Sequence, residues 1–461
     1  MLKRILFAAI AVAVLAGGAL AGSHPGGVAR ELAMGGGPLV PGGFGSPIVL
    51  NPFIYDDPTM MLINPAYQQV YRNYAWWDMA GGAVTGQSAD GYGRQFAGVN
   101  FGFGKEATLG AVLSYDPSLT NLMVSQLASF TQPFRVPQTG LKPVDVLEVT
   151  GTYDMGSLAV GVGILYGWAK NTTSNATAPV PPASSSTELS ASVFGVRLGA
   201  IMDLGGGNAF DASGALRLDK ATDDETGTNN AGNPANSGNY SASTTEIQVE
   251  GRLKLKMSNK VNFVPYVAFG TVSGQPKQDA PATGATAYTG STKLSATLLT
   301  VGAGMEYHLS NFYFAGGLSW KSSSLKSEVT PPLPATGTTT STLSVTELPV
   351  LNMGVEWTLL DWLIGRMGYY RTFQSLGQKT ERPSGQSTTE IDTWAGNSSV
   401  AIGSLPGGDN NLITLGLGLR FGNFALDGTV SDQALRRGLG LIGAQDNINT
   451  FGYVTASYCF D

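Results

Sequence analysis

Residues 245–258, TEIQVEGRLKLKMS, alternate between apolar and polar side chains almost without exception. One set of alternate positions is apolar, and the interleaved set contains five charged residues and one glutamine. Because a β-strand points successive side chains to opposite faces, this segment has one apolar face and one charged face. Such a strand separates an apolar environment from water, as in a soluble β-sandwich or a membrane β-barrel.

The N-terminal residues are those of an exported protein. Lys3 and Arg4 precede an apolar run, residues 5–16, and the small residues Ala19 and Ala21 follow it. This order predicts a signal peptide over residues 1–21 that is cleaved after Ala21. Cys459 is the single cysteine of the chain, so an intramolecular disulfide is excluded.

The composition favours a membrane barrel over a soluble sandwich. Only 13% of the residues are charged, yet no later apolar run is long enough to cross a membrane as a helix. A closed barrel buries apolar surface in lipid through alternating strands whose hydropathy averages out. The net charge of −6 gives no basic stripe for nucleic acid, and two histidines with one cysteine argue against a metal or cofactor site.

The remainder of the chain reads as strands joined alternately by short turns and long polar connections. Strands are expected near residues 74–85, 94–104, 107–116, 143–155, 157–169, 188–204, 209–220, 243–258, 261–273, 292–308, 311–327, 341–359, 361–376, 410–421, 424–431 and 450–460. Long loops are expected over residues 171–187, 221–241, 274–291, 329–340 and 377–409. Short turns at one end and long loops at the other are typical of outer-membrane barrels. The sequence therefore predicts an all-β fold, a transmembrane antiparallel β-barrel of 14–16 strands over residues 73–461.

Residues 22–72 precede the first expected strand and are rich in glycine and proline. They also contain many apolar side chains, such as Phe53, Ile54, Met60 and Met61, which are costly to leave in water. One interpretation is a mobile exported tail. The favoured one is a plug, or hatch, that is packed inside the barrel and buries these side chains.

Three motifs in this segment resemble those of a known family. They are Ala33-Met34-Gly35-Gly36, Asp56-Asp57-Pro58 and Asn64-Pro65-Ala66. Their order just before the first strand resembles the N-terminal hatch of the FadL-type outer-membrane transporters of hydrophobic compounds, and the outline of their PorV-like relatives. The resemblance implies a hatch inside a barrel, a hydrophobic small-molecule ligand such as a fatty acid or hydrocarbon, and release of that ligand by movement around Asn64-Pro65-Ala66.

Charged residues on the polar faces of the strands are expected to line the lumen. The principal ones are Glu246, Glu250, Arg252, Lys254, Arg217 and Glu306. One hypothesis is an ion-selective constriction, in which opposed charges create a transverse field. Because both signs are mixed along single strands, we favour a neutralised lattice that braces the barrel wall against the plug.

The connection after the third expected strand has helical character. Asp116 can cap a helix and Pro117 suits its first position. The apolar residues that would share one face of this helix are Leu119, Leu122, Met123, Leu127 and Phe130. This face either packs on neighbouring loops or, as the resemblance implies, forms a ligand-binding groove at the outer surface.

The sequence predicts no catalytic residues, since neither His24 nor His308 has a nucleophile beside it.

The last strand, residues 452–460, alternates and carries Tyr458 and Phe460 on one face, which resembles the C-terminal signal recognised by barrel-assembly machinery. We therefore expect a monomer in the Gram-negative outer membrane, surrounded by lipid and lipopolysaccharide.

The expected function follows from the resemblance: passive uptake of hydrophobic small molecules through a plugged barrel. Two alternatives stay open. A porin for polar solutes would conduct ions steadily, whereas a plugged barrel would conduct almost none. A PorV-like barrel would transport nothing and would hold a surface or secretion partner, which should copurify with it.

Overall fold

The computed structural model describes residues 26–38, 49–80, 95–116, 144–177, 183–227, 238–279, 291–330, 337–382, 389–395, 411–430 and 451–460. The expected signal peptide and His24 lie outside these residues. No helix among the described residues is both long enough and apolar enough to cross a membrane.

Seventeen strands within the described residues form one closed antiparallel barrel, which β19 closes by pairing with β3. They are β3 (Tyr74–Ala80), β4 (Gln95–Phe103), β5 (Ala107–Asp116), β6 (Val144–Asp154), β7 (Leu158–Thr177), β8 (Ala183–Gly205), β9 (Asn208–Gly227), β10 (Gly238–Lys256), β11 (Val261–Asp279), β12 (Ser291–His308), β13 (Phe312–Thr330), β14 (Thr339–Leu360), β15 (Leu363–Glu381), β16 (Thr389–Ala395), β17 (Asn411–Phe421), β18 (Phe424–Val430) and β19 (Phe451–Cys459). Because β16 and β17 pair with successive parts of the same edge of β15, they share one position, and the barrel has sixteen. The predicted antiparallel barrel is confirmed, and its sixteen strand positions equal the upper limit of the predicted 14–16.

Short turns join the strands at one end of the barrel. Gly104 and Gly422 each have a φ of 60° in such turns, a left-handed conformation that glycine adopts without steric cost. In outer-membrane barrels the short turns face the periplasm.

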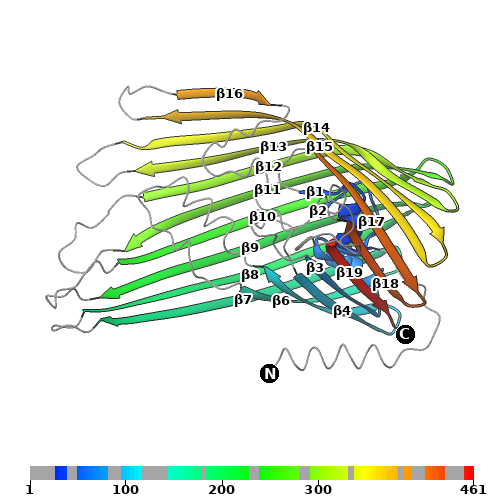
Figure 1. The fold of residues 1–461 in the computed structure, drawn as a ribbon, viewed down its shortest axis with the longest axis horizontal. Coiled ribbons are helices and arrows are strands. Elements are labelled where there is room, and N and C mark those ends of the chain that lie inside the picture. The colour runs from blue at the N-terminus through cyan, green and yellow to red at the C-terminus, as the bar shows by residue number, and fades with distance from the viewer. Residues whose placement is uncertain are drawn as a thin grey trace, which may run out of the picture.

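The strands on one side of the barrel are much longer than expected. Strands β7–β15 have 18 to 23 residues, whereas β3–β6 and β17–β19 have 7 to 11 (Figure 1). The prediction of long loops at 171–187, 221–241, 274–291, 329–340 and 377–409 is therefore wrong where the strands extend into these ranges, at residues 171–177, 183–187, 221–227, 238–241, 274–279, 291, 329–330, 339–340, 377–381 and 389–395. Thr173, for example, pairs with Thr187 across β7 and β8. Threonine and serine fit a paired strand in water, where neither face needs to be apolar.

The apolar and charged side chains of residues 245–258 point to opposite faces of the sheet, as the sequence predicts. Ile247 and Val249 are 44% and 52% exposed, whereas Glu250 and Arg252 are 6% and 2% exposed. The apolar set therefore lies on the outside of the closed sheet and the charged set inside. Other strands repeat this pattern, and their exposed side chains include Val162, Ile164, Tyr166, Trp168, Ile413, Leu417 and Phe421. A closed sheet with an apolar exterior is the architecture of an outer-membrane barrel.

The N-terminal segment, defined here as residues 26–38 and 49–73, lies inside this barrel (Figure 1). It contains α2 (Val28–Ala33), β1 (Gly37–Pro38), β2 (Val49–Leu50) and the 3₁₀ helices η2 (Pro58–Leu62) and η3 (Pro65–Gln69). Helix α2 contacts β15, β17, β18 and β19, and η3 contacts β5–β8. Because these strands belong to different parts of the closed wall, the segment extends across the lumen.

Reversing the polarity of one outward position tests the orientation of the wall. Ile164 lies on the outer apolar face of β7, and Thr172 lies on the same face beyond Trp168. We expect Ile164→Arg to lower the free energy of unfolding by about 2 to 4 kcal/mol, because lipid does not solvate the guanidinium. Thr172→Arg should change it by less than about 1 kcal/mol. Urea unfolding in lipid vesicles measures both; equal effects would contradict this orientation.

Candidate functional site: the contact between the N-terminal segment and the inner wall

Two of the three N-terminal motifs begin short helices. The Oδ1 atom of Asp57 accepts a hydrogen bond from the backbone N of Thr59 at 2.8 Å, at the start of η2. In the same way, the Oδ1 atom of Asn64 accepts one from Ala66 N at 3.0 Å, at the start of η3. Pro58 and Pro65 occupy the first helical positions, where no N–H is needed.

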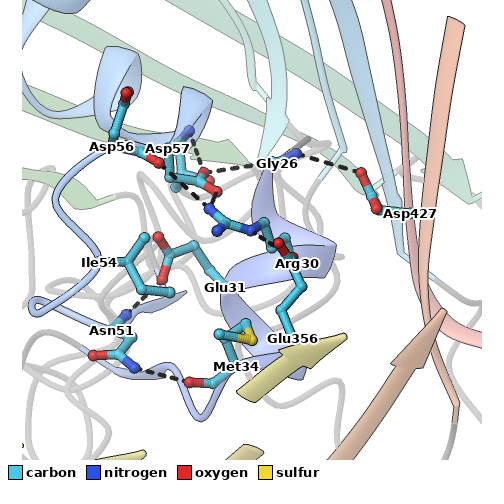
Figure 2. A network of polar contacts seen from close by, with 12 residues as sticks. Gly26, Arg30, Glu31, Met34, Asn51, Ile54, Asp56, Asp57, Glu356 and Asp427 are labelled. Carbon is cyan, nitrogen blue, oxygen red and sulfur yellow. Dashed lines mark hydrogen bonds and ion pairs between the residues drawn. The ribbon is translucent and has the colours of Figure 1, made fainter. Parts of the chain in front are cut away.

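Arg30 connects α2 to the rest of the segment and to the wall (Figure 2). Its Nη1 atom lies 2.9 Å from Asp57 Oδ2, and its Nε atom lies 3.1 Å from Glu356 Oε2 on β14. Glu356 also pairs with Arg366 at 2.5 Å, and Arg366 pairs with Asp427 at 2.6 Å. Charges of alternating sign therefore run from the segment into β14, β15 and β18.

Arg252 attaches the middle of the segment to the opposite wall. Its Nη1 atom donates to the carbonyl of Ile54 at 2.7 Å, and its Nη2 atom donates to the carbonyl of Tyr55 at 3.1 Å. Asp211, 2.8 Å from Nη2, neutralises this buried charge. Lys254 Nζ lies 4.7 Å from the centre of the Tyr55 ring. A buried cation thus binds backbone oxygen atoms of the segment rather than standing free in the lumen.

The four other charged residues named from the sequence also lie on the inner face. Glu306 accepts hydrogen bonds from the backbone N of Tyr55 at 2.9 Å and from the Tyr313 hydroxyl at 2.7 Å. Glu250 accepts from Ser213 at 3.2 Å and from Tyr266 at 3.4 Å. Arg217 lies 2.9 Å from Asp219 and pairs in register with Glu246. Of the six charged residues named from the sequence, Arg252, Lys254 and Glu306 contact the segment.

Helix η3 packs directly on the backbone of the wall. Asn64 Nδ2 donates to the carbonyls of Ala200 at 3.1 Å and Ala212 at 3.2 Å, on β8 and β9. A Cβ on Gly199 would overlap Asn64 Oδ1, and one on Gly161 would overlap the backbone N of Ala66. Glycine at these positions permits the close approach.

The first residue of the Asp-Asp-Pro motif does not share the burial of the second. Asp56 is exposed and accepts a hydrogen bond from the Tyr71 hydroxyl at 2.7 Å, whereas Asp57 is fully buried. The expected groove residues Leu119, Leu122, Met123, Leu127 and Phe130 lie outside the described residues, so the groove stays a prediction.

Two carboxyl groups of the segment have perturbed acidity. Burial raises the pKa of Glu31 well above its usual value, and the nearby charge of Asp57 raises it further. Burial also raises the pKa of Asp57, although Arg30 opposes this rise. Glu31 Oε2 accepts a hydrogen bond from the backbone N of Asn51 at 2.7 Å and so connects α2 to the second half of the segment (Figure 2).

Sequence reasoning missed Arg30, Glu31 and Asn51 as contact residues. The signal was available in part, because Arg30 and Glu31 interrupt an otherwise apolar stretch that the plug interpretation buries. Their partners lie up to 326 positions away, as for Arg30 and Glu356, and no local pattern reveals such pairs. Among the described residues, no group of three or more His, Cys, Asp or Glu side chains could hold a metal ion.

The closed sheet, its apolar exterior and its internal segment define an outer-membrane β-barrel. No protein-family model and no curated protein matches the chain. Solved structures that are similar include the toluene transporter TbuX of Ralstonia pickettii, with 12% identity over 95% of this chain and 99% of that chain, at a TM-score of 0.38. The toluene transporter TodX of Pseudomonas putida has 9% identity over 95% and 97% of the two chains, at 0.37.

The ferric yersiniabactin uptake receptor FyuA of Yersinia pestis is also similar, with 11% identity over 84% of this chain and 79% of that chain, at a TM-score of 0.34. Both toluene transporters are of the FadL type that the N-terminal motifs resemble. With TM-scores below 0.5, these likenesses carry no functional argument, and the fold rests on the strand pairing of this chain.

Removing the Arg252 charge tests the attachment of the segment. We expect Arg252→Met to destabilise the protein by about 3 to 5 kcal/mol, because Asp211 then stays buried without a counter-charge. Trypsin should also cleave after Arg30 or Arg72 earlier than in the unaltered protein. Arg217→Met is the matched control, because Arg217 pairs with Asp219 on the same strand. If trypsin cleaves the segment at the same rate in both variants, Arg252 does not attach the segment to the wall.

A methyl group placed between α2 and the wall tests its docking separately. A Cβ on Gly368 would overlap the backbone N of Gly35, whereas one on Gly151 would meet nothing within 4 Å. We expect Gly368→Ala to speed hydrogen exchange at the amides of residues 28–36, because α2 must move away from β15. Gly151→Ala should leave that exchange unchanged. Unchanged exchange in Gly368→Ala would show that α2 does not pack on this wall.

Proposed function

We propose that the protein is an outer-membrane transporter for passive uptake of hydrophobic small molecules, in which the N-terminal segment acts as the plug. The observation that carries the proposal is the burial of this segment inside the barrel, where Arg252 and Glu356 bind it from different walls. A water-filled pore gives an apolar solute no favourable path, whereas a lumen occupied by apolar side chains does.

The contacts that hold the segment are suited to a plug that moves. They are hydrogen bonds, ion pairs and apolar packing against wall residues such as Trp76 and Val112, and the single cysteine of the chain allows no disulfide to fix the segment covalently. Release of one contact exposes groups that water can solvate, so the segment can shift without unfolding the barrel. The resemblance of Asp56-Asp57-Pro58 and Asn64-Pro65-Ala66 to the FadL-type hatch supports a hydrophobic ligand.

One observation favours a second candidate function, that of a barrel which holds a surface partner. Strands β7–β15 extend well beyond the short strands at the end opposite the periplasmic turns, and their outer parts are rich in serine and threonine (Figure 1). Such a paired, polar sheet could present a platform to another protein. A partner that copurifies in equal amount, together with no uptake, would establish this function instead.

Deletion of residues 26–72 tests the transport proposal. In planar bilayers we expect the full chain to conduct almost no ions and the deletion variant to conduct steadily, because its lumen is water-filled. Cells that carry the full chain should take up a labelled alkane or fatty acid faster than cells without the protein. Steady conductance by the full chain would establish a porin, and no gain in conductance on deletion would show that the segment is not a plug.

A further inference from the structure

Arg371 of β15 is a charged residue on the outer, lipid-facing side of the barrel. The residues on either side of it, Tyr370 and Thr372, are 5% and 1% exposed, and Tyr370 contacts the N-terminal segment in the lumen. Alternation along the strand therefore turns Arg371 outward, together with Tyr369 and Phe373. A cation on this face meets lipid or the lipid headgroups.

Arg371 lies close to the outer edge of the apolar face. The outward side chains of β13–β15 form three successive rows towards the outside: Leu318, Leu351 and Arg371; then Trp320, Leu348 and Phe373; then Ser322, Thr346 and Ser375. A β-bulge at Leu348-Pro349 turns Leu348 outward and Glu347 inward. The second row contains the aromatic residues typical of a membrane interface, and the third is polar, so the interface lies one row beyond Arg371.

The length of β15 agrees with this position. Residues 363–373 span about 34 Å of strand, or about 26 Å along the barrel axis at a tilt of about 40°. The apolar band of an outer-membrane barrel is about 25 Å tall. Counted from the short turns at the periplasmic end, Phe373 therefore reaches the headgroups of the outer leaflet.

The side chain of Arg371 lies against two aromatic residues at this depth. Its Cζ atom lies 4.6 Å from the centre of the Phe373 ring, and its Nη1 atom donates a hydrogen bond to the Tyr369 hydroxyl at 3.4 Å. A long cationic side chain reaches the interface in this way from a backbone position inside the apolar band. Most of the five N–H donors of the guanidinium have no hydrogen-bond partner among the described residues.

Arg371 differs in this respect from lysines farther out on the same face. Lys326 lies 2.5 Å from Glu328 on β13. Lys379 lies 2.8 Å from Glu381 on β15. The described contacts of Arg371 are with aromatic side chains, and no carboxylate is among them. The guanidinium is therefore available to an anion from outside the protein, and its planar fork matches two oxygen atoms of a phosphate group.

We propose that Arg371 binds a phosphate group of lipid A, the membrane anchor of lipopolysaccharide, on the outer surface of β13–β15. The guanidinium donates hydrogen bonds to two phosphate oxygens, and the acyl chains lie on outward apolar side chains such as Leu318 and Leu351. Lipid A is the anionic lipid of the outer leaflet, whereas phospholipids belong to the inner leaflet at the other end of the strands. The site lies on the opposite side of the wall from the N-terminal segment, so the inference does not depend on the proposed transport function.

Binding of diphosphoryl lipid A to the refolded full chain in phosphatidylcholine nanodiscs, measured by native mass spectrometry, tests the inference. We expect Arg371→Met to weaken binding roughly 10-fold or more, because charge-assisted hydrogen bonds to phosphate are lost. Arg371→Lys should weaken it less, because an ammonium group keeps the charge but not the planar fork. Lys379→Met is the matched control, since Lys379 is exposed on the same face of β15, and its binding should stay within about 2-fold of the unaltered protein. Unchanged heat-dependent migration verifies that each variant is folded.

Two further lipids test the chemistry of the site. Dephosphorylated lipid A and phosphatidylglycerol should both bind the unaltered protein several-fold more weakly than diphosphoryl lipid A. Equal binding of diphosphoryl lipid A by the Arg371→Met and Lys379→Met variants would overturn the inference. Dephosphorylated lipid A that binds as tightly as the diphosphoryl form would also overturn it, as would equally tight binding of phosphatidylglycerol, which would show a site for any phosphate headgroup.

Discussion

Lipid cannot supply hydrogen bonds, and this constraint determines the rest of the structure. Every backbone group at membrane depth has to pair within the protein, so the sheet closes and β19 pairs with β3. Closure sends every second side chain to the lumen, where ionisable groups such as Arg252 and Arg366 are buried. Buried charges are costly without partners, so they pair with one another and with polar atoms of the N-terminal segment. The wall that excludes lipid thereby supplies the attachment points for the segment.

The segment is attached at two separate regions of the wall. Helix α2 is held through Arg30 at the β14–β18 side. Residues 54–55 and η3 are held at the β5–β12 side, through Arg252 and through the wall carbonyls that Asn64 contacts. Glycines at both regions bring the two backbones into contact, so small shifts of the segment break several contacts together.

The parts of the structure that depend on local alternation were predictable from the sequence. Residues 245–258 alone indicate which face meets lipid, and the short turns locate the hairpins. The length of strands β7–β15 was not predictable, because serine and threonine tracts are equally compatible with loops and with paired strands in water. The inward position of Glu347 was hidden by a bulge that shifts the alternation by one residue. Partners distant in sequence, such as Arg30 and Glu356, become visible only when the barrel closes.

A cross-link between the N-terminal segment and the wall tests the central claim most directly, namely that this segment folds inside the barrel. A Cβ on Gly416 of β17 would touch the Cβ of Ala33 in α2, so a cysteine pair at these positions needs only a small shift to form a disulfide. In the variant Ala33→Cys, Gly416→Cys, with Cys459→Ser, the account predicts that mild oxidation of intact outer membranes links most molecules internally. A control pair of Ala33→Cys with Ser322→Cys, on the outer face of β13, should form no link. Absence of the first cross-link in folded barrels would contradict the account.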